Sequence, residues 1–144
     1  YFGDPTRADI LRSAGAENAR LLIVALDDVE ATLRVVDTAK RHFPHLKVLA
    51  RARNRHHAHL LMDRDIDGLV RDTFHSALRM AELTLGALGL SPEEAEHTVG
   101  LFRDHDERHL IETHAIYRDE RQLAQSAQQA SQELTELFEA DRRN

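Results

Sequence analysis

The sequence contains no cysteine and no tryptophan, and aromatic residues make up only 5% of its 144 residues. Without cysteine the chain can form neither a disulfide bond nor a reactive thiol, which fits a cytoplasmic setting. Long hydrophobic runs are also lacking, because the longest, Leu21 to Leu26, is followed directly by Asp27. A membrane-spanning helix needs about 20 apolar residues, so no segment of the sequence predicts one.

Basic residues are too few to predict a nucleic-acid partner. The formal charge is −6, whereas binding to nucleic acids depends on a basic surface that displaces phosphate counterions. Hydrophobic residues make up 42% of the chain and charged residues 31%, a composition typical of a soluble, helix-rich protein. The length suits one domain, or one domain with an appendage.

Three short apolar segments predict the strands of a parallel sheet: residues 20–26, 46–50 and 68–71. The first, RLLIVAL, has the continuous apolar pattern of a strand buried on both faces. A helical pattern follows each strand. We expect Asp27 and Glu30 to form the capping pair of the first helix, Asn54 to cap the second and Gly89 to end the third. Strands that alternate with helices in this way indicate an α/β fold with right-handed crossovers.

The pattern changes after residue 90. Ser91, Pro92 and Glu94 form a strong helix start, and no strand pattern follows them. A seam at alternating spacings of four and three residues predicts packing on another helix; its members are Leu123, Ala127, Ala130, Leu134 and Leu137. Residues 91–144 are therefore predicted to be a helical C-terminal extension.

The first residues resemble the middle of a domain. Tyr1 and Phe2 have the pattern of a strand end, and a short helix capped by Thr6 and ended by Gly15 follows. In a doubly wound sheet of strand order 3-2-1-4-5-6, this chain would hold the end of strand 3 and strands 4 to 6. We therefore expect the C-terminal half of a Rossmann-like sheet, truncated on its N-terminal side. Its bare strand edge would be covered by a partner copy, a swapped element or the C-terminal helix.

Ligands of open α/β sheets bind beyond the carboxyl ends of the strands. Four such ends form the expected rim, at residues 3–6, 27–28, 51–53 and 71–73. Gly3 would let a ligand approach the backbone, and the Asp4 carboxylate could accept a hydrogen bond from a nucleotide. The same GDPT stretch is also explained as a simple turn into a helix. The phosphate-binding pattern G-x-G-x-x-G is absent from the chain.

Arg51, Arg53 and Arg55 alternate at the end of the second strand. Guanidinium groups suit carboxylates and phosphates, which predicts a small anionic ligand at this end. The alternative is a solvated basic turn with surface ion pairs.

The histidines suggest a metal site only weakly. His105 and His109 stand at i and i+4, as in the zinc motif H-E-x-x-H, but Asp106 replaces the glutamate and no third ligand is defined. The cluster of His56, His57 and His59 is expected on an exposed helix surface. We predict no metal site and no catalytic residues.

Residues 1–90 closely resemble the C-terminal part of a KTN domain, also called an RCK N-terminal domain, and residues 91–144 do so more loosely. The segments HFPHLKVLARAR and RDTFHSAL carry the resemblance together with the GD-x-T turn. The most similar members belong to Kef-type, glutathione-regulated potassium-efflux antiporters. Pro5 stands where this family usually has alanine, and Asp72 where glutamate is expected.

The resemblance implies a regulatory domain on the cytoplasmic side of the bacterial inner membrane, attached to a membrane antiporter domain, and not an enzyme. It implies a homodimer that binds AMP or NAD(H) and, in Kef proteins, glutathione or its conjugates. By position, the nucleotide contacts would be Gly3, Asp4, Thr6, Asp27 and Asp28. Arg51 and Arg53 would contact glutathione. Because the Gly-rich half is absent, this chain need not bind nucleotide by itself.

Two other functions remain open from the sequence. A stand-alone nucleotide-binding subunit of a Trk-type potassium uptake system would carry a second KTN repeat or a following RCK C-terminal domain, whereas this chain has a helical tail. An NAD-dependent dehydrogenase would need a complete cofactor motif and a catalytic acid or base, and the sequence shows neither.

Overall fold

The computed structural model describes residues 3–143, and the chain divides into two compact units, residues 1–72 and residues 73–144. Tyr1 and Phe2, which we expected to end a strand, lie outside the described residues. The helix that precedes residue 90 groups with the helices after it. The division into domains at residues 1–90 and 91–144 thus stays a prediction, distinct from these units.

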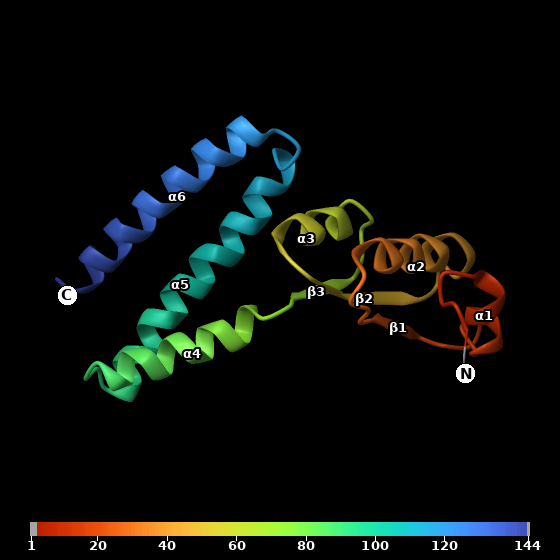
Figure 1. The fold of residues 1–144 in the computed structure, drawn as a ribbon, viewed down its shortest axis with the longest axis horizontal. Coiled ribbons are helices and arrows are strands. Elements are labelled where there is room, and N and C mark those ends of the chain that lie inside the picture. Colours follow the sequence, from red (N-terminus) through yellow and green to blue (C-terminus); the bar gives the residue numbers. More distant parts are fainter. Residues whose placement is uncertain (1–2, 144) are drawn as a thin grey trace. The chain divides into compact units, whose positions relative to one another are not determined.

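The first unit is a parallel α/β sheet with crossover helices (Figure 1). Its elements are α1 (Ala8–Ser13), β1 (Leu21–Val24), α2 (Val29–His42), β2 (Lys47–Ala52), α3 (Arg55–Met62) and β3 (Gly68–Arg71). The strand order is β1-β2-β3, so the central strand pairs in parallel with both neighbours. Val24 lies opposite Ala50, which in turn lies opposite Leu69. The predicted fold class is confirmed.

Only one face of this sheet carries the core. Helices α2 and α3 lie on the same side of the strands in Figure 1, and Val36, Val48 and Leu61 are fully buried. On the other face, Ile23 is 66% exposed and Val70 56% exposed. The expectation that the first strand is buried on both faces is therefore wrong. Because side chains of a strand alternate between faces, the apolar run supplies both the core and an exposed apolar surface.

The helix caps correct two of the sequence predictions. Asp28, not Asp27, caps α2, since its Oδ1 accepts the N–H of Ala31 at 2.6 Å. Thr6 does not cap α1, whose N-cap position is Arg7, with no side-chain bond. Asn54 caps α3 as predicted, accepting the N–H of His57 at 2.8 Å.

The second unit is helical. It contains α4 (Phe74–Ala87), α5 (Pro92–Glu112), the short 3-10 helix η1 (Thr113–Ala115) and α6 (Glu120–Asp141), and α5 packs against both α4 and α6. Gly89, with a φ of +103°, follows the end of α4 as predicted. Within residues 3–143, no helix is both long enough and apolar enough to cross a bilayer.

The predicted seam of α6 is correct in part. Ala130 is buried, and Leu123 and Leu134 are half-buried, but Ala127 and Leu137 are exposed. Ser126 and Phe138 are half-buried instead. A straight helix has 3.6 residues per turn, so its buried stripe drifts away from a strict repeat of seven residues.

The start of α5 gives a test of helix capping. Ser91 Oγ accepts the N–H of Glu94 at 3.2 Å, and the Glu94 carboxylate accepts the N–H of Ser91 at 2.8 Å. The backbone N–H of Ser91, and after it the Ser91 hydroxyl, stabilise the Glu94 carboxylate and lower the pKa of Glu94. Replacing Ser91→Ala removes the side-chain half of this pair, and we expect the free energy of unfolding to fall by about 1 kcal/mol.

Urea denaturation followed by circular dichroism measures this change. Ser131→Ala is the matched control, because Ser131 is an exposed residue inside α6 where alanine is tolerated. If both variants lose the same stability, the capping box does not contribute as described.

Candidate functional site

The carboxyl ends of β1 and β2 bring three predicted site residues together. Arg51 Nη2 donates to Asp27 Oδ1 in an ion pair. Arg53 Nη1 donates to the main-chain oxygen of Asp27 at 3.2 Å. We call Asp27, Arg51 and Arg53 the carboxyl edge. Two guanidinium groups therefore converge on one acidic residue, whose side chain is 86% exposed.

Asp28 has a structural role beside this edge. Its side chain caps α2, and its carbonyl accepts the Thr32 hydroxyl at 2.8 Å. A ligand that approached Asp28 would meet a carboxylate already bound to the helix N-terminus. The predicted pair of neighbouring acidic residues thus divides into an exposed ion-pairing group, Asp27, and a helix cap.

The GDPT turn is closed by Asp4. One carboxylate oxygen of Asp4 accepts both the N–H of Thr6, at 2.9 Å, and the Thr6 hydroxyl, at 2.7 Å. These two hydrogen bonds, first the backbone bond and then the hydroxyl bond, lower the pKa of Asp4. A Cβ at Gly3 would lie 3.0 Å from two carbons of Ile10, so the glycine also allows close packing on α1.

Helix α2 holds the GDPT turn. The Thr38 hydroxyl donates to the Thr6 carbonyl at 2.8 Å, which joins two residues 32 positions apart. Between the turn and α2 lies a hollow of about 270 Å³, lined by Thr6, Arg34, Asp37, Thr38 and Arg41. The turn is thus bonded to the middle of α2, and Asp27 is bonded to the two arginines.

The sequence prediction for His57 is wrong, because this residue is buried and contacts Arg53. We expected it on an exposed helix surface, but it is 1% exposed, and His59 is buried as well. The His57 Nδ1 atom accepts the N–H of Arg53 at 3.0 Å, directly behind the carboxyl edge. The signal was present in the sequence, because His57 stands one turn before the buried Leu61 on the same face of α3.

The other predicted histidine pair joins two helices. His109 Nε2 lies 3.0 Å from the Ser126 hydroxyl, and His105 Nε2 lies 3.8 Å from a carboxylate oxygen of Glu133. Both partners belong to α6. Within residues 3–143 no three histidine, aspartate or glutamate side chains are grouped so that they could hold a metal ion.

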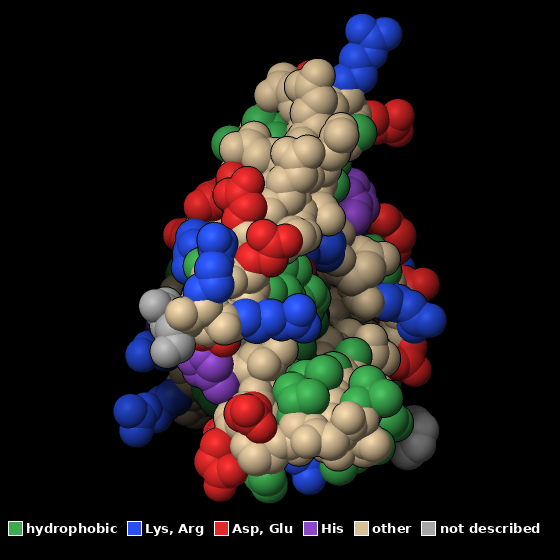
Figure 2. All heavy atoms as spheres, turned by 90° about the vertical axis from the view of Figure 1, so that its left-hand side faces the viewer, with side chains coloured by type: hydrophobic (Ala, Val, Ile, Leu, Met, Phe, Trp, Pro, Cys, Tyr) green, Lys and Arg blue, Asp and Glu red, His purple; other side chains and the backbone are tan. Residues whose placement is uncertain are grey.

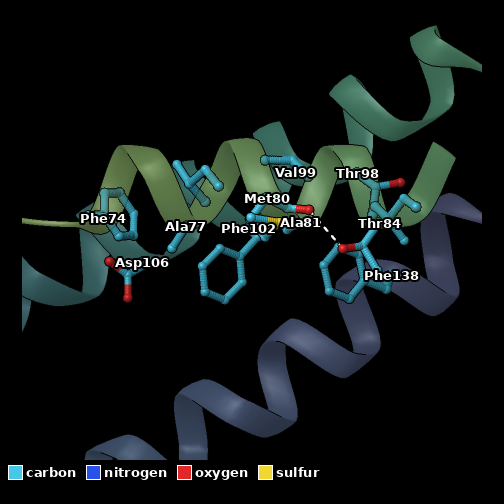
Figure 3. A pocket seen from close by; sticks show the side chains of 12 residues that line it. Phe74, Ala77, Met80, Ala81, Thr84, Thr98, Val99, Phe102, Asp106 and Phe138 are labelled. Carbon is cyan, nitrogen blue, oxygen red and sulfur yellow. Dashed lines mark hydrogen bonds between the residues drawn. The ribbon is translucent and has the colours of Figure 1, made fainter. Parts of the chain in front are cut away.

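The second unit also has an apolar groove of about 600 Å³ between its three long helices. In Figure 3 the rings of Phe102 and Phe138 point into this groove, and Asp106 is the one charged residue among the described residues that line it. Leu83 of α4 and Leu88, which caps the end of that helix, are also exposed. Figure 2 shows hydrophobic side chains gathered low on one face of the molecule, between charged ones.

These features together define a class of protein. A parallel α/β sheet with charged groups at the carboxyl ends of its strands is typical of domains that bind small charged ligands. The described site offers ion-pairing groups at Asp27, Arg51 and Arg53 and hydrogen-bonding groups at the GDPT turn.

Comparisons with known proteins name the family. The TrkA-N domain family matches residues 1–72, and the family described as the potassium efflux system KefB C-terminal domain matches residues 76–144. The solved Kef C-terminal domain of Shewanella denitrificans in its AMP-bound form is 38% identical, with a TM-score of 0.78, over 81% of this chain and 73% of that one. The GsuK RCK domain is 26% identical over 48% of this chain and 15% of that one, with a TM-score of 0.46.

The chain therefore belongs to the KTN domains of Kef-type potassium-efflux systems, as the sequence predicted. It is a regulatory domain of a potassium-efflux system.

The bond between α2 and the GDPT turn can be tested by Thr38→Val. This change keeps the shape of the side chain and leaves the Thr6 carbonyl without its donor. We expect the free energy of unfolding to fall by about 1 kcal/mol, because a lost hydrogen bond of this kind costs that much. Hydrogen exchange of the backbone amides at residues 6–10 should become faster.

Thr135→Val is the control for this experiment. Thr135 donates only along its own helix, to the carbonyl of Ser131 at 2.9 Å, where such a bond adds little to stability. Equal effects of the two changes, with unaltered exchange near Thr6, would contradict the role given to Thr38.

Proposed function

We propose that this chain is the ligand-sensing, dimerising part of a Kef-type K⁺/H⁺ antiporter and that it is not an enzyme. It acts on the cytoplasmic side of the bacterial inner membrane, attached to the membrane antiporter domain of the same protein. The observation that carries the proposal is the convergence of Arg51 and Arg53 on Asp27, in a chain 38% identical to a Kef C-terminal domain.

The carboxyl edge binds glutathione or a glutathione conjugate. Glutathione carries carboxylates, and the planar guanidinium group can donate two parallel hydrogen bonds to a carboxylate. Arg51 is already oriented by its ion pair with Asp27, so less side-chain entropy is lost when it binds a ligand. The ligand carboxylate would take the place of the Asp27 carboxylate on Arg51.

The nucleotide site uses the GDPT turn. The related Kef domain is described in an AMP-bound form, which supports AMP as the nucleotide here, with NAD(H) as the alternative. Gly3, Asp4 and Thr6 form one wall of this site, and Asp27 and Asp28 contribute the end of β1. Asp4 stays ionised to lower pH than an ordinary aspartate, so it remains an acceptor for the hydroxyl or amino groups of a nucleotide.

Regulation acts through a homodimer. A ligand bound between two subunits can shift their arrangement only if it binds one arrangement more tightly than the other. That difference in affinity is the free energy that opens or closes the path for K⁺ in the attached antiporter domain. The match of residues 76–144 to the KefB C-terminal domain favours this function over a Trk-type uptake subunit.

The test is the double change Arg51→Ala and Arg53→Ala in the full-length antiporter. Potassium efflux from cells or proteoliposomes is measured before and after addition of a glutathione conjugate. We expect the response to fall by about tenfold or more, because both charge-assisted contacts to the ligand are lost. Antiporter abundance in the membrane is measured in parallel.

The matched control is Arg103→Ala with Arg108→Ala, which removes the same charge from exposed positions of α5. This control should respond like the unaltered protein. The proposal is refuted if the Arg51 and Arg53 variant responds normally at normal abundance.

A further inference from the structure

His57 is buried directly behind the carboxyl edge. It lies in the first turn of α3, is 1% exposed, and is held by two hydrogen bonds to neighbouring residues. Its own N–H is bound by the Asn54 cap at 2.8 Å, and its ring atom Nδ1 accepts the N–H of Arg53 at 3.0 Å. The ring therefore points back toward the strand end and not into solvent.

This geometry determines which nitrogen of the neutral ring carries the proton. A backbone N–H can only donate, so Nδ1 must carry a lone pair, and the ring proton of neutral His57 sits on Nε2. Nε2 is itself buried and has no hydrogen-bond partner within the described residues. An unpaired buried donor is costly and uncommon in proteins, and such groups are often retained for a functional reason.

The charges around the ring oppose a second proton. Burial is the largest cause that lowers the pKa of His57, and Arg64 and His56 lower it further. Glu30, on the adjacent helix α2, acts in the opposite direction. His57 is therefore neutral at neutral pH and takes up a proton only in acid, below the ordinary range of histidine.

The bond from Arg53 matters because Arg53 contributes to the carboxyl edge. The same residue that donates its N–H to His57 extends its guanidinium group to the carbonyl of Asp27 at 3.2 Å. A protonated ring would present an N–H to the N–H of Arg53, and two donors repel each other. The backbone N–H of Arg53 would lose its acceptor. The Arg53 side chain would then extend from a backbone that is no longer held in place.

We propose that His57 is a positioning residue for the carboxyl edge, and that protonation of its ring releases Arg53 and weakens binding of an anionic ligand. The ligand part of this inference rests on the function proposed above. The structural part, which links the ring of His57 to the backbone of Arg53, does not.

The first experiment follows the Arg53 amide by ¹H–¹⁵N NMR on the 144-residue chain, from neutral pH down to the acidic pH at which the His57 ring resonances have finished titrating. In the unaltered protein the Arg53 amide should shift toward the position of a weaker hydrogen bond as the His57 ring resonances titrate. His57→Asn places an acceptor where Nδ1 stood but does not titrate, so its Arg53 amide should stay constant over this range. In His57→Leu the Arg53 amide should have, already at neutral pH, the resonance position that the unaltered protein reaches in acid, because leucine offers no acceptor.

His42→Asn is the control, because His42 is an exposed histidine at the end of α2. In His42→Asn the Arg53 amide resonance should shift with pH as it does in the unaltered protein. An Arg53 amide that stays constant in the unaltered chain while the His57 ring titrates, or that titrates equally in His57→Asn, overturns the proposal. Should His57→Leu fail to fold, the comparison between the unaltered chain and His57→Asn still decides.

The second experiment measures binding of reduced glutathione to the same proteins by calorimetry at the two ends of this pH range. The affinity of the unaltered chain should fall by about fivefold in acid, and that of His57→Asn should change by less than about twofold. An equal loss in both proteins overturns the coupling between His57 and the ligand. If glutathione binds to neither protein, the proposed ligand is wrong, and the NMR titration alone decides the role of His57.

Discussion

Parallel strands can pair only if the chain returns along a face of the sheet between them, and this constraint organises the whole first unit. Helices α2 and α3 make the two returns on the same face, where they bury the core of the unit. Because all three strands then end at one edge, Asp27 meets Arg51 and Arg53 across more than twenty residues of sequence. The helix caps Asp28 and Asn54 follow from the same geometry, since each helix begins just after a strand.

The edge of the sheet is a dense polar network built from short-range bonds. The Asp4 side chain accepts the N–H of Thr6, and the side chains of Asp28 and Asn54 accept N–H groups in the first turns of α2 and α3. These hydrogen bonds hold the exposed side chains of Asp4, Asp28 and Asn54 in place, whereas the carboxylate of Asp27 is bonded to Arg51 and is 86% exposed. The region thus combines rigid surroundings with one exchangeable ion pair, which suits a site that must recognise a ligand without changing its fold.

Local rules predicted the elements of this fold well. Apolar runs, the cap at Asn54, the capping box at Ser91 and the glycine after α4 gave the strands and most helix ends, because each depends on neighbouring residues. Properties that depend on distant residues were harder to predict. The exposed face of β1 and the burial of His57 are set by which helices cover which side of the sheet. The sequence predicted that Asp27 and Arg51 lie at the same edge of the sheet, but not that they form an ion pair. It also could not show that Asp28 caps α2 in place of Asp27, because this depends on the geometry of the turn.

The ion pair between Asp27 and Arg51 has a consequence for selectivity. An internal carboxylate already neutralises this arginine, so a molecule that enters the edge takes part in an exchange and does not simply add to an empty positive site. A neutral molecule of suitable shape would have to separate the pair and would offer no charge in return. A carboxylate or phosphate replaces one counterion with another at nearly constant electrostatic energy. If the carboxyl edge binds an anionic ligand as proposed, the Asp27 carboxylate competes with that ligand for Arg51 and disfavours neutral molecules.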